Sequence, residues 1–172
     1  ATSSDRVVFI GTSDGVYLAR GNGGQYQLKP VGLQGMGIVR YMLADSRVPR
    51  RVYATTIKNG FWRTDDGGES WKEINQGIIY REAWSLAQNP LTGTLYGVDG
   101  VAGELFEIDL ATGVAGSSVG FARSNMASVG LEFDPADSTL LLSDGPTLYR
   151  MEPATGALTT IGSFDLGSGF ND

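Results

Sequence analysis

Arginines placed beside aromatic side chains form the clearest chemical pattern in this sequence. They occur in three short segments, 34–41, 78–84 and 121–128. The residues concerned are Arg40, Tyr41, Tyr80, Arg81, Glu82, Trp84 and Arg123. A guanidinium group binds a carboxylate through two parallel hydrogen bonds, and an aromatic ring stacks on a flat or apolar ligand face. The pattern therefore predicts a site for a glycan or an anionic small molecule.

The composition argues against several kinds of chemistry. The chain has no His, the commonest general base and metal ligand, and no Cys, so thiol chemistry is excluded. The acidic and amide side chains before four glycines could form a ring of oxygens, but turn formation alone accounts for them. These side chains are Asp14, Asn59, Asp99 and Asp144. The alternating acidic loop of a calcium site is absent, so we assign no catalytic residue, metal or cofactor.

The same four dipeptides reveal an internal repeat. Asp14-Gly15, Asn59-Gly60, Asp99-Gly100 and Asp144-Gly145 recur at intervals of about 45 residues. Each lies between two segments rich in β-branched and aromatic residues, which predicts a hairpin. A repeat of this length containing hairpins is typical of a propeller blade.

Further predicted strands extend each hairpin to a blade. An inner strand precedes the hairpin in the last three copies, and an outer strand follows it in all four. The predicted fold is therefore an all-β propeller of about four four-stranded antiparallel blades, in a single domain. The blades would span 7–34, 35–77, 78–120 and 121–164.

One turn carries a nameable motif. The sequence from 64 to 71 matches the order S/T-x-D-x-G-x-S/T-W at Thr64, Asp66, Gly68, Ser70 and Trp71. It resembles the Asp-box of the BNR repeat in sialidase-like β-propellers. That resemblance implies a structural turn on the outer rim, away from the ligand face. The segments 108–113 and 151–156 are instead similar to YVTN-type or quinoprotein-like propeller repeats, from which no activity follows.

The two ends of the chain leave the closure of the ring open. The first copy lacks an inner strand, whereas 165–172 resembles the start of another one. In one interpretation, 165–172 completes the first blade and closes a ring of four. In the other, the chain is part of a larger propeller, or a half-propeller that pairs with a second copy because open edges and apolar faces favour association.

Charge is distributed unevenly along the chain. Residues 1–86 carry 11 Lys or Arg and 8 Asp or Glu, whereas residues 87–172 carry 2 and 11, so the halves have net charges of +3 and −9. The acidic half argues against nucleic acid binding. We expect Arg47, Arg50 and Arg51 to lie in a solvated loop, with a phosphate or protein contact as the second interpretation.

The remaining sequence features concern location. No apolar run approaches the roughly 18 residues of a membrane span. Residues 1–5 contain no Met and no apolar core, so they are not an intact signal peptide, and a mature end after cleavage is one interpretation. The expected location is extracellular or periplasmic.

Three functional hypotheses follow. The first is a non-catalytic propeller that binds a glycan, an anionic ligand or a protein. The second is a glycan-active hydrolase or lyase of the sialidase-like type, or a fragment of one, with Tyr80, Glu82 and Trp84 near its pocket. The third is a half-propeller whose partner is another copy of itself.

Overall fold

The computed structural model describes residues 6–22, 25–57, 59–76, 83–99, 101–120, 126 and 129–164. Within these residues the chain forms four antiparallel sheets and no helix, and each sheet is built from strands consecutive in sequence. The first sheet has three strands and the others have four. The all-β prediction of about four antiparallel blades is confirmed.

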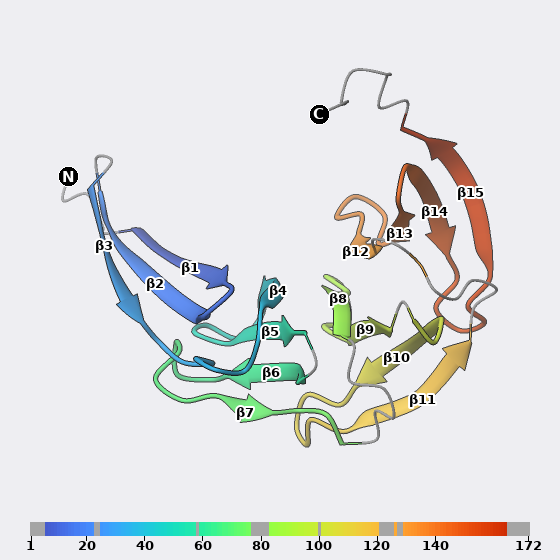
Figure 1. Ribbon diagram of the computed structural model, residues 1–172. Coiled ribbons are helices and arrows are strands. Elements are labelled where there is room, and N and C mark those ends of the chain that lie inside the picture. Colours follow the sequence, from blue (N-terminus) through green and yellow to red (C-terminus); the bar gives the residue numbers. More distant parts are fainter. Residues whose placement is uncertain are drawn as a thin grey trace.

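The strands follow one another across each sheet from the inside of the arc to its rim (Figure 1). The first sheet contains β1 (Arg6–Thr12), β2 (Gly15–Asn22) and β3 (Gln25–Pro30). The second contains β4 (Val39–Ala44), β5 (Val52–Thr56), β6 (Gly60–Thr64) and β7 (Lys72–Glu73). The third contains β8 (Ala83–Gln88), β9 (Leu95–Asp99), β10 (Glu104–Ile108) and β11 (Ala115–Gly120). The fourth contains β12 (Val129–Phe133), β13 (Leu140–Asp144), β14 (Thr147–Met151) and β15 (Leu158–Ser163).

The sheets are arranged around a common centre as an open arc. In Figure 1, β4, β8 and β12 lie innermost, whereas β3, β7, β11 and β15 form the rim, and the first and fourth sheets lie at opposite ends of the arc. Such an arrangement is a partial propeller. The predicted contribution of 165–172 to the first sheet lies outside the described residues.

Glycine permits the tight hairpin turns between strands. Gly15, Gly60 and Gly145 have φ values of 98°, 71° and 54°, in the left-handed region that other residues resist. In the second sheet, the resulting register pairs Val52 with Thr64 and Thr56 with Gly60. The turn dipeptides therefore set the strand pairing that the repeat predicted.

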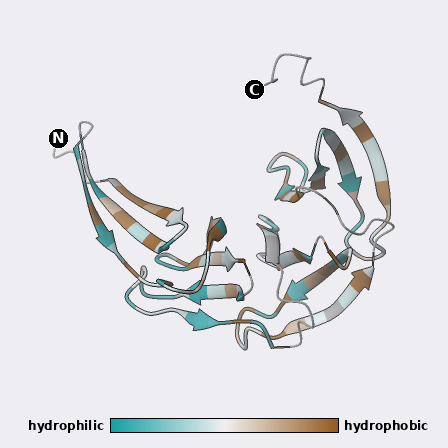
Figure 2. Cartoon of the chain, viewed as in Figure 1, coloured by the Kyte–Doolittle hydropathy of each residue, from teal (hydrophilic) through white to brown (hydrophobic). Residues whose placement is uncertain are grey.

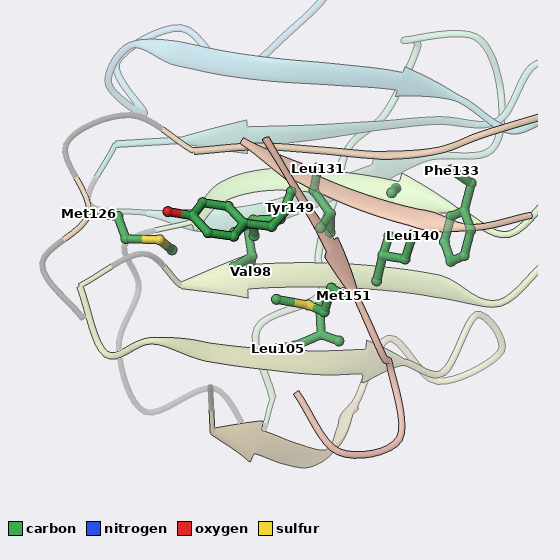
Figure 3. Close-up of a cluster of buried hydrophobic side chains, with 10 residues drawn as sticks. Val98, Leu105, Met126, Leu131, Phe133, Leu140, Tyr149 and Met151 are labelled. Carbon is green, nitrogen blue, oxygen red and sulfur yellow. The ribbon is translucent and has the colours of Figure 1, made fainter. Parts of the chain in front are cut away.

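Hydrophobic side chains lie between neighbouring sheets, in three clusters. The largest joins the third and fourth sheets and includes Leu105, Leu131 and Leu140 (Figure 3). The next joins the second and third sheets, where the rings of Phe61 and Phe106 meet edge to face with centroids 5.3 Å apart. The smallest joins the first and second sheets. Each sheet therefore depends on its neighbour to cover an apolar face.

A glycine allows the two Phe rings to approach. A Cβ atom at Gly97 would lie 2.6 Å from the ring of Phe106 and 3.1 Å from that of Phe61. Gly97 is buried and pairs with Phe106 across the β9–β10 ladder. The second and third sheets therefore pack closely because this strand has no side chain at the contact.

Replacing Phe61 by Ala should destabilise the protein strongly. Phe61 is fully buried, and removal of its ring leaves a cavity between two sheets, which costs about 3–5 kcal/mol. Urea unfolding followed by circular dichroism measures the change. Leu91→Ala is the control, since Leu91 is 77% exposed and its loss should change stability by less than about 0.5 kcal/mol. Equal effects of the two substitutions would contradict the packing described.

Candidate functional site

Two of the predicted site residues occupy matching positions at the starts of neighbouring inner strands. In β4 the pairing with β5 shifts between Val39 and Tyr41, so Arg40 is an extra residue in a β-bulge. In β8 the pairing with β9 shifts between Ala83 and Ser85, so Trp84 is the extra residue there. Bulges of this kind re-aim side chains and are common beside active sites. The side chain of Arg40 is exposed, and for Trp84 only the strand position is described.

Tyr41, the next residue of β4, connects two inner strands. Its hydroxyl donates a hydrogen bond to the Glu132 carboxylate of β12, with 3.3 Å between the oxygens. Burial, followed by the charge of Glu132 and this hydrogen bond, raises the pKa of Tyr41 to about 12. Tyr41 therefore stays protonated at neutral pH and donates a hydrogen bond to Glu132. The sequence did not identify Glu132, because the pair is separated by 91 positions.

Tyr80, Arg81, Glu82 and Arg123 lie outside the described residues. Neither a metal site nor a membrane span is found in the part of the chain that the structure describes. No three acidic side chains there lie close enough together to hold a metal ion. The described part of the chain also contains no helix long and apolar enough to cross a membrane.

The turn after β6 is held by side-chain hydrogen bonds to Asp66. Ser70 donates to the Asp66 carboxylate from its backbone N–H at 3.0 Å and from its hydroxyl at 2.6 Å. The Thr64 hydroxyl donates to the same carboxylate at 2.7 Å and accepts a bond from the N–H of Gly68. The bonds from Ser70, with that from Thr64, hold the pKa of Asp66 far below its usual value. The carboxylate therefore ties both sides of the turn together.

Trp71 connects this turn to the first sheet. Its indole N–H donates to the carbonyl oxygen of Val31 at 2.6 Å. Its ring lies so close to Gly32 that a Cβ atom there would be 2.4 Å from the ring edge. Trp71 also packs against the smallest hydrophobic cluster, which joins the first and second sheets. This contact fixes the position of the first sheet relative to the second.

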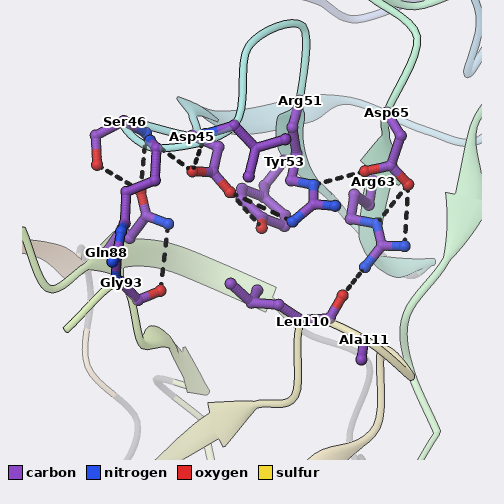
Figure 4. Close-up of polar contacts among 12 residues, drawn as sticks. Asp45, Ser46, Arg51, Tyr53, Arg63, Asp65, Gln88, Gly93, Leu110 and Ala111 are labelled. Atoms are coloured by element: carbon purple, nitrogen blue, oxygen red, sulfur yellow. Dashed lines mark hydrogen bonds and ion pairs between the residues drawn. The ribbon is translucent and has the colours of Figure 1, made fainter.

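The loop between β4 and β5 contains a buried carboxylate (Figure 4). Asp45 accepts hydrogen bonds from the N–H groups of Arg47 and Val48 and from the hydroxyl of Tyr53, at 2.9, 3.0 and 3.0 Å. Burial acts to raise the pKa of Asp45, but these hydrogen bonds outweigh it and lower the pKa below the usual value. The ionised Asp45 therefore fixes the loop on the second sheet.

Further polar contacts in Figure 4 extend from this loop to the third sheet. The Gln88 side chain of β8 accepts bonds from the N–H and hydroxyl of Ser46, and it donates to the carbonyl of Gly93 at 3.2 Å. Arg63 of β6, which is only 7% exposed, binds Asp65 and donates to the carbonyl of Leu110. We call this set of contacts between the second and third sheets the polar clasp.

The expected solvated loop of arginines is confirmed for Arg47 and Arg50, which are exposed, and is wrong for Arg51. The Arg51 side chain is 19% exposed and bonds to Asp65 at 2.5 Å, with Asp45 at 3.7 Å. Arg50 pairs with Glu69 at 3.1 Å and donates to the carbonyl of Asp66. Arg47 donates to the carbonyl of Thr92 across the junction with the third sheet. Each of these arginines also binds an acceptor in a turn at least 14 positions away, a contact that the composition does not predict.

The polar clasp and the bulges lie at opposite ends of the inner strands. The clasp surrounds the loop that follows β4, whereas Arg40 and Trp84 lie at the beginnings of β4 and β8. The clasp side chains are paired with each other, so they have structural roles. The beginnings of β4 and β8 carry two of the residues that the sequence predicted for ligand binding.

Comparisons with known proteins agree with a propeller. No protein-family model matches the chain, and neither does any curated protein. Among solved structures, an ancestral GH74 enzyme superposes with a TM-score of 0.73 at 16% identity over 96% of this chain and 24% of that one. An auxiliary nutrient binding protein from Bacteroides thetaiotaomicron gives 0.68 at 16% identity, over 94% and 40% of the two chains. The WD40 β-propeller domain of Doa1 gives 0.62 at 15% identity, over 89% and 49%.

These similarities establish the fold class. The chain is a partial β-propeller, and it spans less than half the length of each of these three structures. At such identities the likeness concerns the fold alone.

Acid should destabilise the protein through its depressed carboxyl pKa values. Because the folded pKa of Asp66 lies below the unfolded value of about 3.9, its stabilising effect is complete above that value and is lost as the pH falls through the folded pKa. We expect the urea midpoint to fall between pH 6 and pH 3. Asp66→Asn should lower the midpoint at pH 6 and make its pH dependence shallower.

Asp14→Asn provides the control for this experiment, since Asp14 lies exposed in a hairpin turn. It should leave the urea midpoint at pH 6 close to that of the parent. If Asp66→Asn and the parent lost stability in parallel from pH 6 to pH 3, the structural role assigned to the ionised Asp66 would be wrong.

Proposed function

We propose that the protein is a non-catalytic binding and assembly module. Its ligand, a glycan or a small anion, would bind at the beginnings of the inner strands. The observation that carries this proposal is the pair of matching bulges at Arg40 and Trp84, on two inner strands that are in contact. Two neighbouring blades thus deviate from regular strand pairing at the same place. Bulges at such matching positions are typical of sites where a side chain is re-aimed for function.

The residue types at these bulges suit such a ligand. Arg40 would bind a carboxylate through two parallel hydrogen bonds, and Trp84 would stack on an apolar sugar face. The bond to Glu132 would hold the Tyr41 ring in place, so that the ring could help to orient the ligand. Tyr80, Arg81 and Glu82 precede β8 directly in the sequence and would contribute further polar groups, as would Arg123.

We further propose that the Thr64–Trp71 turn is an Asp-box of the BNR type. The bonds from Ser70 and Thr64 to Asp66, and the contact of Trp71 with the first sheet, support a structural role for it. Thr64, Asp66, Gly68, Ser70 and Trp71 would accordingly hold the fold and take no part in ligand binding. A protein that captures glycans or anions in this way would act outside the cytoplasm, in the extracellular space or the periplasm.

Assembly is the second component of the proposed function. The first sheet has one strand fewer than the others among the described residues, and several of its large apolar side chains are exposed. Such a sheet favours association with further blades. Those blades would come from a second copy of the chain or from a larger propeller of which this chain is a part.

Arg40→Ala should weaken ligand binding without unfolding the protein. The probe is an array of glycans that includes acidic sugars, followed by calorimetry with the best binder. Loss of a charged bidentate contact should reduce affinity by roughly 10-fold to 100-fold. Arg20→Ala is the matched control, because Arg20 is an exposed arginine on β2 of the first sheet. The Arg20→Ala variant should bind the ligand with the affinity of the parent.

The same experiment separates binding from catalysis. Retained affinity in both Arg40→Ala and Trp84→Ala would overturn the proposed site. A parallel assay measures whether the parent hydrolyses or cleaves glycosides. If it does, and if Glu82→Gln abolishes this turnover, the protein is a hydrolase or lyase and not a binding module.

A further inference from the structure

The outward face of the first sheet is apolar, and several of its large side chains are exposed. On antiparallel strands, directly paired residues share one face. The register places Val8, Ala19 and Leu28 in one row, and Ile10, Tyr17 and Pro30 in the next. Val8, Ile10 and Leu28 are 46%, 37% and 63% exposed. We call these two rows the head face, and Figure 2 shows hydrophobic bands along β1 and β2, two of the strands that carry it.

The head face points away from the rest of the molecule. The opposite face of β1 carries Phe9, which packs on the cluster shared with the second sheet. It also carries Gly11, where a Cβ atom would lie 2.7 Å from Val39. Alternation along β1 therefore directs Val8 and Ile10 outward. In the second, third and fourth sheets, the face in the same position is covered by the preceding sheet.

The fourth sheet ends the arc with an outward face of its own. Its inward face supplies Leu131, Leu142 and Tyr149 to the largest cluster. The register places Leu141, Arg150 and Thr159 in one outward row, and Ser143, Leu148 and Gly162 in the next. We call these two rows the tail face. It combines half-buried leucines with polar side chains, as the rim and centre of a protein interface do.

We propose that the head face of one chain docks on the tail face of a second copy. This inference rests on the assembly role proposed above and adds the partner, the polarity and the contact residues. The contact would continue the packing of sheet on sheet beyond the end of the arc. Because each copy has one head and one tail, two copies joined at both ends would form a closed assembly around a two-fold axis.

Charge favours this polarity over the alternatives. The half that contains the head face has a net charge of +3, and the half that contains the tail face has −9. Opposite charges speed the encounter of a head with a tail, whereas two tails repel each other. Salt should therefore weaken the association, since it screens surface charges.

Sedimentation velocity of the 172-residue protein from 1 to 100 µM, in low and high salt, tests the proposal. We expect a concentration-dependent dimer in the parent. Leu28→Asp should raise the dissociation constant by at least roughly 30-fold, because it places a charge in an apolar contact. Gln27→Asp is the control with the same change in charge on the other face of β3, and it should dimerise like the parent.

Two tail variants complete the design. Leu148→Asp should also prevent dimerisation, and Thr159→Asp, whose side chain is already exposed, repeats the test with little risk to folding. Circular dichroism confirms that each variant is folded. A mixture of Leu28→Asp and Leu148→Asp should recover part of the dimer, because one intact head meets one intact tail.

Each other outcome overturns the proposal in a recognisable way. If Leu28→Asp prevents dimerisation while both tail variants dimerise normally, the head face pairs with itself and the polarity is wrong. A parent that stays monomeric to 100 µM refutes both this inference and the assembly role. Glycan binding is measured separately and remains informative in either case.

Discussion

Each sheet of this protein depends on its neighbour to cover an apolar face. Backbone hydrogen bonds hold strands together within a sheet, but the buried side chains lie between sheets. Counted over the described residues, the three clusters contain ten, eight and four buried residues from the fourth sheet to the first, so packing weakens towards the N-terminal end. Grooves of about 640 and 730 Å³ lie along the weakest junction, beside Trp71 and Phe9 respectively. Trp71 strengthens this junction through its bond to Val31.

The two ends of the inner strands differ in their contacts. At one end, the polar clasp holds the second and third sheets together through Arg63 and Gln88, and its charged groups are neutralised by one another. At the other end, Arg40 and Trp84 interrupt regular pairing. A scaffold fixed at one end can present adaptable residues at the other, which is how many folds separate stability from binding.

Much of the architecture was predictable because its determinants are local. The Asn59-Gly60 turn and the alternation in β5 and β6 specify a hairpin within a few residues, and Asp66 binds groups only two and four residues away. The clasp was not predictable, since Arg63 meets Leu110 across 47 positions and Ser46 meets Gln88 across 42. The candidate site was predicted in part: residue types pointed to Arg40 and Trp84, but a two-residue period does not reveal the extra residue of a bulge. An arginine in a strand beside an acidic turn, as at Arg63 and Asp65, is the signal that could have indicated the clasp.

The central claim is that stability comes from packing between sheets, so that the end of the arc with the least cover is the least stable. Hydrogen–deuterium exchange resolved by strand, in dilute protein, measures this most directly. The amides of β9 and β10, whose sheet is covered on both faces by the second and fourth sheets, should exchange slowest, and those of β1 to β3 should exchange fastest. Equal protection of the first sheet and the internal sheets at the same dilution would contradict the account.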